Sequence, residues 1–182
     1  MVKRPSKTEM NQGKKFEHDF VKSVPEYAMI YRLPDAAQSF GGSNNLRFSH
    51  KNPFDFFLFD SRRQILYGIE TKTVKGKSIS FERTKEENGV IHYHQIQGLH
   101  KYNKYDNAVF GFMIEFREIE KTIFIDIESF QTLVDSICKK SFNYGDLENS
   151  NIDYYIVSQS KNRTRYKYDI DDFLINYRYK GE

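Results

Sequence analysis

Two apolar runs decide how this chain folds: Pro53-Phe54-Asp55-Phe56-Phe57-Leu58-Phe59 and Ile65-Leu66-Tyr67-Gly68-Ile69-Glu70-Thr71-Lys72. Short runs rich in Phe, Ile, Leu and Tyr predict β-strands, and the polar stretch between them predicts the turn of a hairpin. Because side chains alternate between the two faces of a strand, Glu70 and Lys72 point one way and Thr71 points the other. We therefore expect the hairpin to bring Asp55 beside Glu70.

These residue types suit metal-dependent phosphodiester chemistry. Two carboxylates and a lysine on one buried face are costly unless something compensates their charge. Mg²⁺ takes oxygen ligands, which Asp55, Glu70 and the backbone carbonyl of Thr71 could supply. Such an ion activates a bound water, and Lys72 could orient that water or balance charge in the transition state. The alternative is an exposed ion pair at the edge of a hairpin, and the two strands alone leave both interpretations open.

Length and composition predict one folded domain. The 182 residues suit a single domain spanning residues 1–182, and 16% aromatic content with sixteen Phe compensates for only 38% hydrophobic residues. Residues 1–12 are a candidate flexible basic segment. The net charge of +3 favours an anionic partner only weakly.

Compartment and membrane association follow from what the sequence lacks. Cys138 is the single cysteine, which excludes an intramolecular disulfide and a cysteine-rich zinc site, and its surroundings predict a buried helical position. No apolar run approaches the roughly 18–20 residues of a membrane span, and the N-terminus has no signal-peptide core. We therefore expect a cytoplasmic protein without a membrane partner.

Alternating helical and strand patterns predict an α/β or α+β fold, with a mixed central β-sheet flanked by helices. Ser6 and Glu9 form a capping-box pattern that opens a helix ending at Val24, before Pro25. Its predicted core stripe contains Phe16, Phe20, Val21 and Val24. Further along we expect a strand at 27–33, a polar loop at 35–53, a short strand at 78–81, a helix at 94–105, a hairpin of 108–116 with 122–127, a helix to about 140, and strands near 153–158 and 165–170.

The order of acidic and basic residues resembles a known signature. Asp55 followed by Glu70-Thr71-Lys72 is similar to the D-x(n)-E-x-K pattern of the PD-(D/E)xK nuclease superfamily, although Phe54 and not proline precedes Asp55. The literal pair Pro34-Asp35 ends an earlier segment and has no apolar strand after it. We therefore assign the signature to Asp55.

Within that superfamily the chain most resembles RecU-type Holliday junction resolvases. The resemblance rests on four features in order: Gly13-Lys14-Lys15-Phe16-Glu17 on a helix, the Asp55 and Glu70-Thr71-Lys72 strands, Ser78-Ile79-Ser80-Phe81 followed by His94-Gln95-Ile96, and the tail Arg163-Thr164-Arg165-Tyr166-Lys167-Tyr168-Asp169.

That resemblance implies a restriction-endonuclease-like fold and an Mg²⁺- or Mn²⁺-dependent homodimer that nicks branched DNA symmetrically. It implies Asp55 and Glu70 as metal ligands, Lys72 as the catalytic lysine, Glu17 as an auxiliary acid and Gln95 as a residue near the scissile phosphate. Without it, Glu17 is typical of a solvated surface charge. A nuclease for linear duplex DNA and a non-catalytic DNA-binding module remain alternatives.

The remaining motifs give weaker indications of function. His92, His94 and His100 could suggest zinc, but no cysteine accompanies them. Gly76-Lys77-Ser78 is not a nucleotide-binding P-loop, because Thr71 stands where that motif needs glycine, so we expect no nucleotide cofactor. Basic residues near the candidate site predict a DNA-contacting surface, with scattered solvated charges as the alternative. The candidate DNA-binding residues are Lys14, Lys15, Arg47, Lys51, Lys75 and Lys77.

Overall fold

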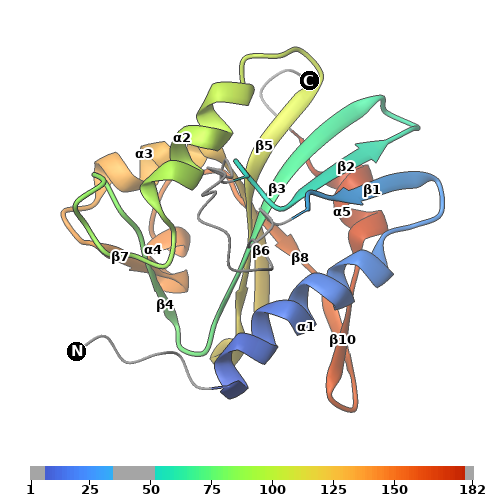
Figure 1. Ribbon diagram of the computed structural model, residues 1–182, viewed down its shortest axis with the longest axis horizontal. Coiled ribbons are helices and arrows are strands. Elements are labelled where there is room, and N and C mark those ends of the chain that lie inside the picture. Colours follow the sequence, from blue (N-terminus) through green and yellow to red (C-terminus); the bar gives the residue numbers. More distant parts are fainter. Residues whose placement is uncertain (1–6, 35–51, 179–182) are drawn as a thin grey trace, which may run out of the picture.

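The computed structural model describes residues 7–34 and 52–178 and shows three layers, with a central β-sheet between two layers of helices (Figure 1). The sheet has six strands in the order β1-β2-β3-β5-β6-β8. The strands are β1 (Ala28–Arg32), β2 (Phe56–Asp60), β3 (Ile65–Val74), β4 (Ser78–Ser80), β5 (Ala108–Phe116), β6 (Lys121–Asp126), β7 (Ser141–Asn143), β8 (Tyr155–Val157), β9 (Gln159–Asn162) and β10 (Arg165–Tyr168). The helices are α1 (Lys7–Ser23), α2 (Tyr93–Tyr102), η1 (Arg117–Ile119), α3 (Ile127–Ser136), α4 (Tyr144–Glu148) and α5 (Ile170–Asn176).

The sheet is mixed, which confirms the predicted α+β class. β3 and β5 pair in parallel, whereas the other neighbouring strands of the sheet pair in antiparallel fashion. A parallel pair needs a long crossover, and the chain from β3 to β5 supplies one that contains β4 and α2. β4 pairs with β7, and β9 pairs with β10, in two small sheets outside the central one.

One face of the sheet is covered by α1, α5 and the β9–β10 hairpin. Phe16 and Phe20 of α1 are buried against strand residues there, as their helical spacing predicts. Val21, which was assigned to the same stripe, is instead exposed, because it follows Phe20 by one residue and a helix turns about 100° per residue.

The opposite face is covered by α2, α3 and the β4–β7 pair (Figure 1). Ile96 and Leu99 of α2 and Phe130 of α3 are buried against the aromatic side chains of β5. Within the described residues, no helix is long and apolar enough to cross a membrane.

The prediction for Cys138 was wrong, since α3 ends at Ser136 and Cys138 is exposed. The apolar pattern continues past the end of the helix because Ile137 adopts an extended backbone and still packs against the core. Arg83 stabilises this helix end by donating to the carbonyls of Val134 and Ile137 at 2.7 and 2.6 Å. Sequence patterning also missed β7, β9, α4 and α5.

Candidate active site

The β2–β3 hairpin places two acidic residues at the same level of the sheet, as predicted. Phe56 pairs with Ile69, and the N–H of Asp55 donates to the carbonyl of Ile69 at 3.1 Å. Asp55 therefore stands directly before β2 and opposite Glu70. On its other side, Leu33 donates its N–H to the Asp55 carbonyl at 2.8 Å. The Asp55 backbone is thus held from both neighbouring segments.

The Asp55 carboxylate is fixed against β3 by Thr71. The N–H and the hydroxyl of Thr71 donate to Oδ2 of Asp55 at 2.8 and 2.7 Å. The N–H and C=O of one strand residue point to the same side of the strand, so the Thr71 carbonyl is also directed to the side where Asp55 lies. A carboxylate and a backbone carbonyl thus share this edge of β3.

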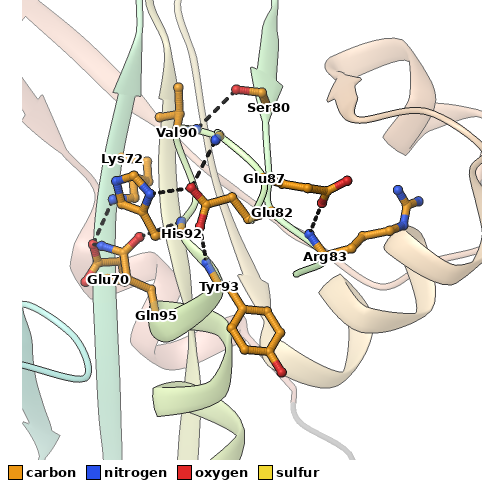
Figure 2. Close-up of polar contacts among 11 residues, drawn as sticks. Glu70, Lys72, Ser80, Glu82, Arg83, Glu87, Val90, His92, Tyr93 and Gln95 are labelled. Carbon is orange, nitrogen blue, oxygen red and sulfur yellow. Dashed lines mark hydrogen bonds and ion pairs between the residues drawn. The ribbon is translucent and has the colours of Figure 1, made fainter. Parts of the chain in front are cut away.

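Glu70 is buried and lies at the centre of a polar cluster (Figure 2). Its Oε1 atom is 2.9 Å from Nζ of Lys72 and also accepts a hydrogen bond from Nε2 of Gln95. The side chains of Glu70 and Lys72 are only 5% and 14% exposed. The exposed-ion-pair interpretation is therefore wrong. Removing two charges from water is costly, so a buried pair of this kind is a candidate functional site.

Burial raises the pKa of Glu70 to about 7. The positive charge of Lys72 opposes this rise, while the negative charges of Asp55 and, more weakly, Glu17 add to it. The negative charges of two other carboxylates therefore act on Glu70 at this end of the sheet. A cation bound among them would relieve both the desolvation cost and the mutual repulsion.

Glu17 reaches the site from α1, but its carboxylate is engaged elsewhere. Its Oε2 atom lies 2.9 Å from Nε of Arg32, at the end of β1. Both side chains are partly exposed, at 24% for Glu17 and 39% for Arg32. Arg32 was assigned no role from the sequence, because an arginine at a strand end, two residues before Pro34, offers no chemical signal.

Gln95 enters the site from the first turn of α2. Its Oε1 accepts the N–H of His92 at 2.9 Å, while its Nε2 donates to Glu70. These two contacts have opposite polarity, so together they fix which end of the carboxamide faces the carboxylate. Gln95 is 9% exposed, and the structure brings it into direct contact with Glu70, the residue that also pairs with Lys72.

The carboxylates offer a divalent cation two oxygens. Within the described part of the chain, Oδ1 of Asp55 and Oε2 of Glu70 accept no hydrogen bond. In residues 7–34 and 52–178, no three His, Cys, Asp or Glu side chains gather as a metal cluster. Mg²⁺ commonly uses one or two carboxylates with water and substrate phosphate, so two carboxylates and the Thr71 carbonyl fit such an ion.

The candidate DNA-binding lysines lie on two elements. Lys14 is exposed and Lys15 half-buried on α1, whereas Lys75 and Lys77 are exposed in the turn between β3 and β4. Both groups adjoin η1, because Lys77 is 3.5 Å from Glu118, and Lys15 lines a cavity of about 30 Å³ together with residue 117. Arg47 and Lys51, like the 41–45 stretch, lie outside the described residues.

A second buried carboxylate lies on the other face of β3. Glu115 of β5 accepts hydrogen bonds from the hydroxyls of Thr73 and Tyr168 at 2.6 and 2.9 Å. It thereby ties β3 to β10, so Tyr168 from the basic-aromatic tail has a structural contact. An acidic residue within the apolar run of β5 is the sequence signal that could have identified Glu115.

Comparisons with known proteins add two similarities. The sequence matches no protein-family model. It is 35% identical over 127 residues to the SPbeta prophage-derived uncharacterized protein YotM of Bacillus subtilis (strain 168), a match covering 67% of this chain and 59% of that protein. Among solved structures, Hjc, a Holliday junction resolvase from Archaeoglobus fulgidus, is similar with a TM-score of 0.49 and 14% identity, covering 75% of this chain and 93% of Hjc.

Proposed function

We propose that this protein is a divalent-metal-dependent DNA endonuclease that resolves four-way branched DNA with symmetric nicks. One observation carries the proposal: the buried Glu70–Lys72 pair flanks Thr71, which is bonded across the β2–β3 hairpin to Asp55, and within the described residues one oxygen of each carboxylate accepts no hydrogen bond. Asp55, Glu70 and Lys72 also form the nuclease-like signature in the sequence. A resolvase substrate has two-fold symmetry, so a homodimer is the matching assembly.

Asp55, Glu70 and the Thr71 carbonyl would hold Mg²⁺ or Mn²⁺. When bound, the ion would polarise a phosphoryl oxygen and lower the pKa of a ligated water. The protein's own groups would position the reactants. Within the described residues, Lys72 pairs with Glu70 alone, so its ammonium retains donors for the attacking water or a phosphate oxygen. Gln95 would hold Glu70 in its ligating orientation.

Affinity for DNA would come from the basic residues around the site. Lys14 and Lys15 on α1 and Lys75 and Lys77 beyond β3 would contact phosphates without reading sequence. The preference for a junction over a linear duplex rests on the resemblance to RecU-type resolvases. A duplex-cutting nuclease and a non-catalytic DNA-binding module are the two other candidates.

Cleavage of defined substrates tests the proposal. A four-way junction, a linear duplex and a single strand are incubated with the protein, with and without Mg²⁺. Symmetric nicks confined to the junction support the resolvase, while uniform cutting of duplex supports the second candidate. Binding without cleavage in Mg²⁺ or Mn²⁺ supports the third and overturns the enzyme.

Matched variants assign the chemistry to the site. Asp55→Ala and Glu70→Ala should abolish cleavage and leave DNA binding nearly unchanged, because they remove ligands and not the basic surface. Asp135→Ala is the control, since Asp135 is exposed on α3 and bonds only Gln131 in the described part of the chain. Wild-type cleavage by the Asp55 or Glu70 variant would contradict the assignment.

A further inference from the structure

Glu82 is a buried acid that the candidate site leaves unexplained. It lies two residues after β4 in the crossover, is 7% exposed, and faces the start of α2 (Figure 2). Its Oε2 accepts the N–H of Tyr93, the first residue of α2, at 2.7 Å. Its Oε1 accepts from Nδ1 of His92 at 2.8 Å and from the N–H of Gly89 at 3.1 Å.

Those contacts keep Glu82 ionised. Burial acts to raise its pKa, but the hydrogen bonds from His92, Tyr93 and Gly89 outweigh burial and lower the pKa to about 2. A carboxylate at the N-terminus of a helix is also favoured by the helix dipole. Glu82 therefore holds the start of α2 as a permanently charged group.

The same helix start holds Gln95. The N–H of His92 donates to Oε1 of Gln95 at 2.9 Å, and Nε2 of Gln95 donates to Glu70. Hydrogen bonds thus run without a break from Glu82, through His92 and Gln95, to the Glu70 carboxylate (Figure 2). A shift of His92 would move the N–H donor that orients the Gln95 carboxamide.

The segment that carries Glu82 is itself anchored. The N–H of Glu82 donates to the Ile91 carbonyl at 2.9 Å, and Arg83 donates to three carbonyls at and just beyond the end of α3. Gly89 approaches the Phe81 backbone so closely that a Cβ there would lie 2.7 Å from the Phe81 carbonyl carbon. Glu82 is therefore held in a fixed position against the start of α2.

We propose that Glu82 is a positioning residue, which acts through His92 and Gln95 to orient Glu70 for catalysis. This inference rests on the nuclease function proposed above. Partners that orient ligating groups typically contribute about 10–100-fold to activity or metal affinity. Glu82→Gln should therefore lower the single-turnover cleavage rate at least about tenfold while the Kd for DNA stays unchanged.

Glu87→Gln is the matched control. Glu87 lies in the same segment and accepts from the N–H of Arg83 at 2.6 Å and from Lys140 at 3.0 Å, away from α2. The variant makes the same chemical change and should leave the cleavage rate unchanged. An equal loss of rate in both variants would mean that the segment acts only through its folding, and would overturn the proposal.

A double-mutant cycle tests the route through Gln95. If Glu82 acts through Gln95, Glu82→Gln should cost little more in a Gln95→Ala background, because the link is already broken. Independent, multiplicative losses would overturn the route. A wild-type rate for Glu82→Gln would overturn the inference but leave the nuclease standing.

A second readout needs no cleavage, so it tests whether Glu82 positions Gln95 separately from the nuclease function. The carboxamide NH₂ signals of Gln95 in a ¹⁵N–¹H spectrum, assigned by their loss in Gln95→Ala, should shift in Glu82→Gln and stay in place in Glu87→Gln. Unshifted signals in Glu82→Gln would overturn the proposal. Glu82→Asp retains the charge with a shorter reach, so it should give the same shift if Glu82→Gln fails to fold.

Discussion

Thr71 donates both its N–H and its hydroxyl to one oxygen of Asp55, so the carboxylate is clamped to β3 at the point where β2 begins. The clamp sets the rotation of the Asp55 carboxylate and leaves Oδ1 without a hydrogen bond from the residues that the structure describes. A metal ligand needs this kind of support, because a freely rotating carboxylate must be ordered whenever an ion binds.

Thr71→Val removes half of that clamp and keeps the shape of the side chain. A lost buried hydrogen bond should lower the free energy of unfolding by about 1–2 kcal/mol. The cleavage rate should fall about tenfold, as for the loss of a group that orients a ligand. Denaturant unfolding and single-turnover cleavage measure the two effects.

Thr122→Val is the control for this prediction. The Thr122 hydroxyl is buried on β6 and donates to Gln159 at 2.5 Å, on another part of the sheet. This variant should lose stability by a similar amount and keep its rate. Equal rate losses in the two variants would show that the rate follows stability and not the clamp.

The sequence could predict the Asp55, Glu70 and Lys72 arrangement because it depends on local rules. Strand alternation places Glu70 and Lys72 on one face, and a short turn sets the hairpin register. The Thr71 contact also follows from that register, although only its carbonyl was considered. Burial of the pair, which decides between an active site and an exposed ion pair, depends on how α2 packs and could not be derived locally.

The sequence could not predict the roles of residues that depend on how distant segments pack together. Glu82 and Arg83 lie in a charged stretch without periodicity, and their partners at the start of α2 and near the end of α3 are 10 to 56 residues away in the sequence. Gln95 was found through the resemblance alone, since a glutamine in a helix gives no chemical signal. Cys138 shows the opposite error, because apolar spacing continued after the helix had ended.

Lys72→Met tests the role of the buried ammonium. Because the charge of Lys72 favours the Glu70 carboxylate, its loss should raise the pKa of Glu70 further above its ordinary value of 4.5. Removing one electrostatic stabiliser of a transition state costs about 10²–10³ in rate, so cleavage should fall by that factor. Carboxyl ¹³C titration and single-turnover rates measure the two effects. Lys101→Met, an exposed change on α2, should alter neither, and a wild-type rate for Lys72→Met would remove Lys72 from the mechanism.

The raised pKa of Glu70 predicts how stability depends on pH in metal-free protein. Between pH 4.5 and about 7 the folded state keeps a proton that the unfolded state has lost. The free energy of unfolding should therefore decrease as pH rises through this window and level off above it. At about 1.4 kcal/mol per pKa unit, the total decrease in the free energy of unfolding is on the order of 3 kcal/mol.

Glu70→Gln isolates this component, since it cannot titrate. The difference in unfolding free energy between wild type and Glu70→Gln should therefore change with pH over this window. Denaturant unfolding across the pH range measures it. Above pH 7, Mg²⁺ should stabilise wild type but not Glu70→Gln, because it binds the ionised carboxylate. A difference that stays constant with pH would contradict the raised pKa.

Salt dependence of DNA binding tests the basic surface. Each phosphate contact contributes about −0.9 to the slope of log K against log salt concentration on duplex DNA. Replacing both Lys75 and Lys77 with alanine should therefore reduce the slope by up to about 2 and weaken binding to every sequence alike. Glu118, 3.5 Å from Lys77, competes with a DNA phosphate for the lysine ammonium, so Glu118→Gln should tighten DNA binding slightly. Lys104→Ala, exposed beyond the far end of α2, is the control and should leave the slope unchanged. If the Lys75 and Lys77 double variant keeps the wild-type slope, DNA does not cross the turn between β3 and β4, and the α1 lysines become the remaining described contacts.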